Sequence, residues 1–241
     1  MANKANLFLI IGIVVVAGIL LWIIFQNNSS DGFSITPGSN KVITEHYGGD
    51  ALWVRESIDE LERNATDVMR AEVLDSRVEM ICMLAYAPSK ELEERFTKPH
   101  TVYSLKVLEV FKGNKMTGDV VEIMQAGGKI GNRKLINDRM VPLSSGDDLF
   151  FFLRNYEKLG PEHPPMALEA GIQSVFRIAS TDKNKFADGI EAAFLANPSL
   201  SDIAFENFDY DFNPKPLTLT VGDLMRIKAQ IEDNNSEDHD D

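Results

Sequence analysis

An uninterrupted apolar run near the N-terminus constrains the chain more than any other feature. The run "LFLIIGIVVVAGILLWIIF", from Leu7 to Phe25, contains no charged, amide or hydroxyl side chain. At about 1.5 Å of rise per residue, a helix of this length crosses the roughly 30 Å hydrocarbon core of a bilayer. We therefore predict one transmembrane helix over residues 7–25, with the lipid bilayer as its partner.

A cleaved secretory signal is the alternative interpretation of this run. The apolar part of such a signal spans about 7–15 residues and is followed by small residues at the cleavage site. Here the run is longer, ends with the bulky Trp22 and Phe25, and is followed by "QNNSS" without an A-x-A pattern. No cysteine follows that would carry a lipoprotein anchor. These observations favour an uncleaved signal-anchor.

The charges around the run predict its orientation. Lys4 precedes it, and Asp31 is the first charge after it. Positive charge accumulates on the cytoplasmic side of a span. We expect residues 1–6 to form a cytoplasmic stub of a single-pass protein in the cell membrane, with the bulk of the chain extracytoplasmic.

The remaining chain divides into three parts by composition. Residues 26–45 are rich in Ser, Asn and Gly and predict a flexible tether. Residues 46–233 predict one extracytoplasmic domain with flanking helices, one starting at Ser57 with a capping box and one starting at Thr220. The acidic residues 234–241 predict a disordered tail.

Short apolar stretches with alternating polarity dominate the predicted domain. They are separated by Gly, Pro and Asn clusters, with little helix between them, which is typical of a small antiparallel barrel or sandwich. We expect strands over residues 66–84, 101–112, 119–125, 148–155 and 171–180.

The predicted strand 101–112 contains a change of phase. Tyr103, Leu105 and Val107 share one face, whereas Leu108 and Val110 lie on the opposite parity. A one-residue slip of this kind is produced by a β-bulge, which bends a strand. The slip therefore predicts a bent barrel strand.

Several phrases of the predicted strands resemble the netrin-like, or tissue-inhibitor-of-metalloprotease-type, OB barrel. The resemblance covers residues 65–179, and Ala65–Glu79 is similar to the first strand of that family. It also extends to membrane-anchored or secreted Gram-positive bacterial proteins with this pattern and no assigned activity. The matching residues are Val107, Val110, Phe111, Lys112, Gly113, Gly146, Leu149, Phe150, Phe152 and Leu153.

The resemblance implies a fold and a bacterial cell-surface location rather than an activity. The fold implied is mainly β, a small OB-like (netrin-like) antiparallel barrel with flanking helices, preceded by one transmembrane helix. The inhibitory members of the family use an N-terminal cysteine and a disulfide framework. This chain has a single cysteine, Cys82, so metalloprotease inhibition is not implied.

Nucleotides and nucleic acids are poor candidates as ligands. Gly127, Gly128 and Gly131 follow a predicted strand, but neither a Lys-Ser/Thr pair nor a clean helix follows them, as phosphate-binding loops require. The formal net charge of -13 argues against nucleic acid. We expect no cofactor.

No catalytic or metal-ligating set is recognisable. The apolar surroundings of Cys82 predict a buried, inert thiol. The histidines are scattered and no two of them have ligand spacing; they are His46, His100, His163 and His239.

The stretch "FENFDYDF" alternates aromatic and acidic residues. Its rings are expected to cover the barrel; alternatively, they form an exposed recognition surface, since OB barrels bind ligands on one face. The residues of this possible surface are Phe205, Phe208, Tyr210 and Phe212.

The anchor, the barrel pattern and the missing catalytic set together predict a function. We expect a membrane-anchored extracytoplasmic binding or interaction module without catalytic activity, whose partner is an unknown protein or cell-envelope component. An exported hydrolase with an unrecognised site and an accessory subunit of a cell-envelope complex remain as alternatives.

Overall fold

The computed structural model describes residues 42–47, 54–84, 89–160, 163–178, 183–208 and 215–237, which form a mainly β domain with short helices. The predicted transmembrane helix (7–25) and nearly all of the predicted tether lie outside these ranges. Within them, none of the helices combines the length and the apolar character needed to cross a membrane.

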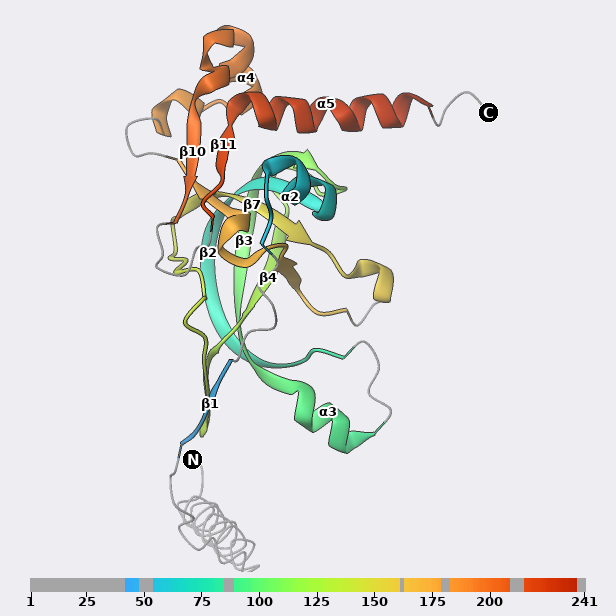
Figure 1. The fold of residues 1–241 in the computed structure, drawn as a ribbon, viewed down its shortest axis with the longest axis vertical. Coiled ribbons are helices and arrows are strands. Elements are labelled where there is room, and N and C mark those ends of the chain that lie inside the picture. Colours follow the sequence, from blue (N-terminus) through green and yellow to red (C-terminus); the bar gives the residue numbers. More distant parts are fainter. Residues whose placement is uncertain are drawn as a thin grey trace, which may run out of the picture. The chain divides into compact units, whose positions relative to one another are not determined.

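A closed five-stranded barrel forms the centre of the domain (Figure 1). The ring runs β2-β3-β4-β8-β7 and closes from β7 back to β2; only the β4–β8 pair is parallel. The strands are β2 (Asp67–Cys82), β3 (Thr97–Lys112), β4 (Val120–Ala126), β7 (Asp148–Arg154) and β8 (Met166–Leu168).

Strand β7 is apolar along nearly its whole length because both of its faces are buried. Leu149, Phe151 and Leu153 point into the barrel interior. Phe150 and Phe152 point outward into a second core. A continuous apolar run is the expected sequence of a strand with two covered faces.

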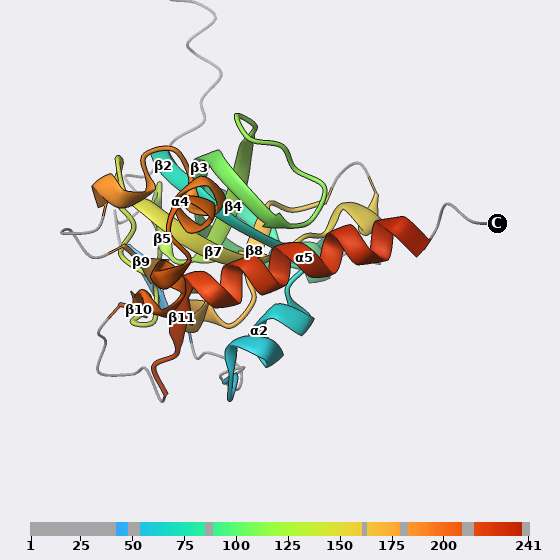
Figure 2. The same cartoon turned by 90° about the horizontal axis from the view of Figure 1, so that it is seen from above.

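The second core lies between the outer face of the barrel and the C-terminal third of the chain. The sheet continues from β7 through β9 (Val175–Arg177), β10 (Ala204–Asn207) and β11 (Thr218–Thr220). Helix α5 (Val221–Glu237) packs against β3, and the view from above shows it crossing the barrel strands (Figure 2). Rings from several strands and from the 3₁₀ turn over Lys183–Phe186 fill the space: Phe111, Phe150, Phe152, Phe176, Phe186 and Phe205.

The bulge predicted in β3 is confirmed. Arg70 of β2 pairs with Glu109 and Ala71 pairs with Val107, so that Leu108 is the extra residue between them. The slip exchanges the faces of the strand: Val107 lies in the barrel interior, whereas Phe111 lies in the second core. One strand thereby contributes to both cores.

A small second sheet lies beyond the β2–β3 ribbon, in the order β1-β6-β5. It consists of β1 (Ile43–His46), β5 (Gly128–Ile130) and β6 (Arg133–Ile136), with β1 parallel to β6. Strand β1 thus begins inside the segment predicted as a tether. Its pairing depends on β6, far along the chain, so the local sequence carries no signal for it.

The helices begin at polar caps. In α2 (Ile58–Asn64) the amide of Glu60 donates to Ser57 Oγ at 3.2 Å, as the capping box predicts. In α3 (Lys90–Phe96), Leu92 N donates to Ser89 Oγ. At α5 Thr220 and Asp223 cap each other reciprocally, and the helix reaches Glu237, inside the predicted tail.

The predicted strand 171–180 is mostly not a strand. Residues Gly171–Ser174 form a 3₁₀ turn, η2, before the short strand β9. Gly171 has φ +55°, and Ser174 Oγ accepts a hydrogen bond from Ala170 N at 2.6 Å, so the side chain stabilises a turn. The remaining elements are helix α4 (Ile190–Ala196) and the 3₁₀ turns η1 (Glu157–Leu159), η3 (Lys183–Phe186) and η4 (Pro198–Asp202).

Candidate binding pocket

An open pocket of about 430 Å³ lies at one end of the barrel. It forms where β2 begins, where β3 ends and where β7 gives way to η1. Its lining comes from three segments far apart in sequence and consists mostly of polar residue types, although carbon atoms supply most of the surface that faces the pocket: Thr66, Asp67, Gly113, Asn114, Asn155, Glu157 and Lys158.

Asp67 is the most unusual residue of the lining. Its side chain is buried, with 2% of the residue exposed. Oδ2 accepts a hydrogen bond from Thr66 Oγ1 at 2.7 Å, whereas Oδ1 has no hydrogen-bond partner among the described residues. Burial raises the pKa of this carboxyl, and the hydrogen bond from Thr66 opposes the rise only in part.

Gly113 forms the wall against Asp67. Its φ is +108°, and a Cβ atom at this position would lie 2.2 Å from Asp67 Oδ1. Glycine is therefore required both for the backbone conformation and for the close approach of the two segments. The neighbouring Lys112 holds the strand end in place, since its Nζ donates to the Glu62 carboxylate and carbonyl, each at 2.7 Å.

The third segment of the pocket is held by Asn155 and its neighbours. Asn155 N donates to Thr66 Oγ1 at 2.7 Å, and Asn155 Oδ1 accepts from Glu157 N at 2.7 Å. Glu157 also forms an ion pair with Lys115. The hydrogen bond from Lys115, supported by Asn155, lowers the pKa of the Glu157 carboxyl.

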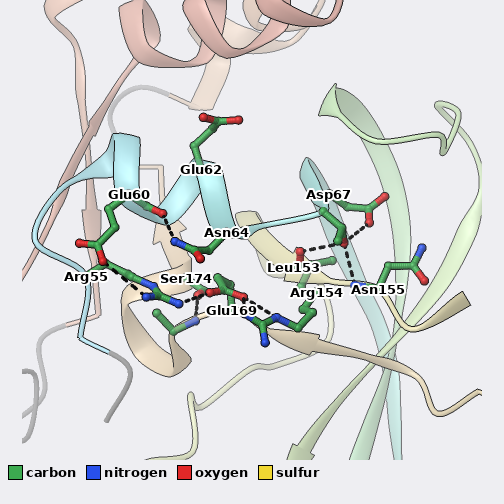
Figure 3. Close-up of polar contacts among 12 residues, drawn as sticks. Arg55, Glu60, Glu62, Asn64, Asp67, Leu153, Arg154, Asn155, Glu169 and Ser174 are labelled. Atoms are coloured by element: carbon green, nitrogen blue, oxygen red, sulfur yellow. Dashed lines mark hydrogen bonds and ion pairs between the residues drawn. The ribbon is translucent and has the colours of Figure 1, made fainter. Parts of the chain in front are cut away.

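The residue before Asn155 belongs to a different network. Figure 3 shows Arg154 pointing toward Glu169, away from the Asp67 and Asn155 side of β7. The Glu169 side chain is fully buried and pairs with both Arg154, at 2.7 Å, and Arg55. Gln173 accepts from the amide of Arg55 at 2.9 Å. These bonds attach the segment before α2 to the barrel, and we assign them a structural role.

The pocket combines two carboxyl groups whose pKa values move in opposite directions. Burial favours the protonated form of Asp67, while Lys115 favours the ionised form of Glu157. The side-chain amide of Asn114 and the ammonium of Lys158 complete the lining. The site therefore offers hydrogen-bond donors and acceptors and two carboxyl groups in different environments.

The aromatic residues predicted as a possible recognition surface lie apart from this pocket. Phe205 is 1% exposed, with its ring 4.6 Å from that of Phe150. Phe208 is half-buried under the Arg177 guanidinium, 4.1 Å from the ring centroid. Tyr210 and Phe212 lie outside the described residues, so the surface stays a prediction.

Other residues weighed from the sequence lie elsewhere. His100 is buried, and burial lowers its pKa. Cys82 is half-buried and unpaired. The glycines of "AGGKIGN" belong to the start and turn of the β5–β6 hairpin. Across the described ranges, no three His, Cys, Asp or Glu residues gather as a metal site.

The pocket has no signature in the sequence. Asp67 opens an apolar strand, where a polar residue is ordinary, and Asn155 and Glu157 fall in a turn. Of the residues of this region, only Gly113 appears in the sequence comparison, where it belongs to the resemblance to netrin-like barrels. The difference between the environments of the Asp67 and Glu157 carboxyl groups arises only where the three segments meet.

Comparison with known proteins adds no relative: no protein-family model matches the chain, and no curated protein matches it significantly.

Proposed function

We propose that this chain is a membrane-anchored extracytoplasmic binding module, held at the cell surface by the helix predicted over residues 7–25. The barrel is proposed to be of the OB type. The meander β2-β3-β4, the single parallel pair β4–β8 and the closure of β7 onto β2 support this assignment. The resemblance to netrin-like domains belongs to the same proposal.

The observation that carries the binding function is the buried carboxyl of Asp67 in the open pocket. Buried polar atoms in folded proteins are nearly always hydrogen-bonded, and an exception calls for an explanation. Asp67 Oδ1 has no such bond among the described residues, and its residue lines an open cavity. Because Oδ1 is covered by Gly113, we infer that a ligand which donates hydrogen bonds reaches this acceptor after a small displacement of the Gly113 wall.

The lining indicates the class of ligand. Carboxyl and amide oxygens of Asp67, Asn114 and Glu157 accept hydrogen bonds, while Lys158 and the amide nitrogens donate them. A small polyol or aliphatic amine satisfies acceptors of this kind. We infer that the module binds such a molecule without transforming it.

Saturation-transfer NMR on the full chain in detergent tests this function. The panel contains neutral mono- and disaccharides and aliphatic diamines. Asp67→Asn is expected to abolish the transfer signal, whereas Asp188→Asn, at an exposed aspartate away from the pocket, is expected to retain it. Binding that persists unchanged in folded Asp67→Asn protein would contradict the proposal.

A second candidate function is favoured by the two carboxyl groups. Glycoside hydrolysis uses one carboxyl group with a raised pKa as acid and a second carboxyl group with a lower pKa as nucleophile or base. Here Asp67 takes the first role and Glu157 the second. An exported glycosidase predicts turnover of nitrophenyl glycosides that falls about 100-fold or more in both Asp67→Asn and Glu157→Gln. Absence of turnover in the unaltered protein would leave the binding module as the function.

The anchor and its orientation need a separate test. Protease added to intact cells is expected to remove the bulk of the chain, and alkaline carbonate is expected to leave the protein in the membrane pellet. Full protection from protease would contradict the outward orientation, and release by carbonate would contradict the anchor.

A further inference from the structure

The β5–β6 hairpin, residues 128–136, has a charge pattern that nothing within the domain explains. Lys129 and Lys134 lie directly opposite each other across the two strands. Both side chains are exposed, and neither has an ion pair among the described residues. Like charges in directly opposed positions destabilise a sheet. The pair therefore suggests that an anionic partner compensates for the repulsion.

The hairpin also lacks acidic residues of its own. The sequence "GKIGNRKLI" contains three cations and no Asp or Glu. The nearest carboxylate across the sheet, Glu45 of β1, is paired with Lys98 and Arg133. These partners lower the pKa of Glu45, chiefly through Lys98, so its charge is balanced. Lys129 and Lys134 remain as a net positive surface.

Exposed apolar side chains lie at the same end of the sheet as these cations, on its other face. Ile130, at the turn of the hairpin, is 37% exposed. Ile43 and Val42, at the start of β1, are 52% and 39% exposed. Ile43 pairs with Arg133, which itself pairs with Ile130, so the three residues follow one another across the sheet. Directly opposed residues share a face and successive residues alternate, so Ile130 and Ile43 lie on the face opposite to Lys129 and Lys134. The two sets come together only at the turn end of the sheet, where a hairpin inserted edge-on would bring both to a bilayer interface.

The described part of the domain begins beside the hairpin turn. Because β1 runs parallel to β6 from Ile43, the polypeptide enters the domain beside the hairpin turn (Figure 1). The predicted span ends at Phe25, and a tether of the composition of residues 26–41 has an r.m.s. reach of about 20 Å. The hairpin turn is therefore within reach of the membrane surface.

We propose that the hairpin turn docks on an anionic lipid surface. This surface, which we call the basic edge, consists of Val42, Ile43, Lys129, Ile130 and Lys134. Lipid head groups compensate the two lysines, and the apolar side chains enter the interface. The inference rests on the proposed membrane anchor.

The net charge of the whole chain does not oppose this contact. The chain as a whole carries -13. Charges separated by more than about 8 Å are largely screened at physiological ionic strength, so the local positive surface dominates at the membrane. The acidic remainder is repelled, which orients the domain with its basic edge toward the lipid and leaves its other surfaces in water.

The experiment uses the full chain reconstituted in vesicles. Ile130→Cys, in a Cys82→Ser background, carries an environment-sensitive NBD label; the control label is at Leu195→Cys on α4, a residue 70% exposed. Vesicles are phosphatidylcholine alone or with phosphatidylglycerol. At position 130 we expect blue-shifted emission and an iodide-quenching constant at least about twofold lower with phosphatidylglycerol. At position 195 we expect no change.

Charge variants test the lysines. Lys129→Glu with Lys134→Glu is expected to remove the protection at position 130, and high salt is expected to reduce it. The matched pair Lys106→Glu with Lys185→Glu, which makes the same charge change outside the hairpin and outside the pocket, is expected to retain it.

Four outcomes would overturn the proposal. These are equal quenching at positions 130 and 195 in both vesicles, protection that is independent of phosphatidylglycerol, protection retained in the Lys129/Lys134 variant, and protection in lipid-free detergent that rises with protein concentration and so reports self-association. Carbonate extraction of the same sample distinguishes failure of the docking from failure of the anchor. A protein that resists extraction but leaves position 130 exposed to water contradicts the docking alone.

Discussion

Asp67 shows how the burial of a single carboxyl group lowers the free energy of unfolding when that group is ionised. Its pKa is raised, so the folded state holds the proton to higher pH than the unfolded state does. Its stabilising contribution is therefore complete in acid and is lost as pH rises above about 4. We expect the free energy of unfolding of Asp67→Asn to exceed that of the unaltered protein by an amount that grows with pH. This difference should reach about 1 kcal/mol at neutral pH.

Urea unfolding of both proteins in detergent, between acid and neutral pH, measures this difference. Asp188→Asn is the control and is expected to follow the unaltered protein at every pH. A difference that shrinks toward neutral pH would show that the Asp67 carboxylate is stabilised by a partner instead of being penalised by burial.

Gly113 is the second residue on which the pocket depends. Gly113→Ala forces a Cβ into the Asp67 carboxylate and strains a backbone at φ +108°. We expect a loss of about 3 kcal/mol in the free energy of unfolding. Gly118→Ala, at φ +95° with open space around it, isolates the backbone strain and is expected to cost about 1 kcal/mol. Equal losses would mean that the contact with Asp67 is unimportant.

At the scale of the element, helix α4 depends on a carboxylate from the barrel. The two oxygens of Glu109, next to the bulge in β3, accept hydrogen bonds from Ile190 N at 2.7 Å and Glu191 N at 3.2 Å. An acidic group at a helix N-terminus also interacts favourably with the helix dipole. The bulge therefore positions the cap of a helix that lies far away in the sequence.

Removing this cap should make α4 open locally under conditions in which the barrel stays folded. Glu109→Ala is expected to cost about 2 kcal/mol, because it leaves two amide donors without acceptors. Hydrogen exchange at Ile190 and Glu191 should accelerate, while the amides of β2 stay protected. Glu109→Gln, which keeps one acceptor, should show a smaller effect; acceleration spread evenly over all elements would contradict a local cap.

The segment before α2 depends on Glu169 in a similar way. Glu169→Gln leaves the buried guanidinium of Arg55 and that of Arg154 without their shared anion. Breaking a buried pair from one side is expected to cost about 3 kcal/mol in the free energy of unfolding. Chemical denaturation measures the loss, and Glu79→Gln, in an exposed ion pair with Arg77, is the control with little expected change. Comparable losses in the two variants would argue against a special role for the buried network.

At the scale of the whole molecule, the two cores share β7 and therefore should unfold together. Phe151 lies in the barrel interior and Phe150 lies in the second core, on adjacent positions of one strand. We expect Phe150→Ala and Phe151→Ala each to cost about 3–5 kcal/mol. Hydrogen exchange should show β3 and β10 opening together in both variants. Independent opening of β10 in Phe150→Ala would show that the second core is a separate unit.

The parts of this fold that follow from neighbours in the chain were predictable from the sequence. The phase slip at Leu108, the capping box at Ser57 and the helix start at Thr220 each depend on residues within a few positions of one another. Strand β7 was recognised because its apolar run is continuous. The identification of a mainly β domain rests on the same local patterns.

The remaining features depend on contacts between distant segments. Strand β1 was assigned to the tether because its partner, β6, lies far along the chain, and the short strand β8, which closes the ring, has no pattern of its own. The pocket likewise joins Asp67, Gly113 and Asn155, each ordinary in its own stretch. The sequence by itself therefore determined which segments extend, bend and begin helices, because local hydrogen bonds and side-chain alternation govern these. Only the tertiary structure decided which segments meet, and with them the burial that makes Asp67 unusual.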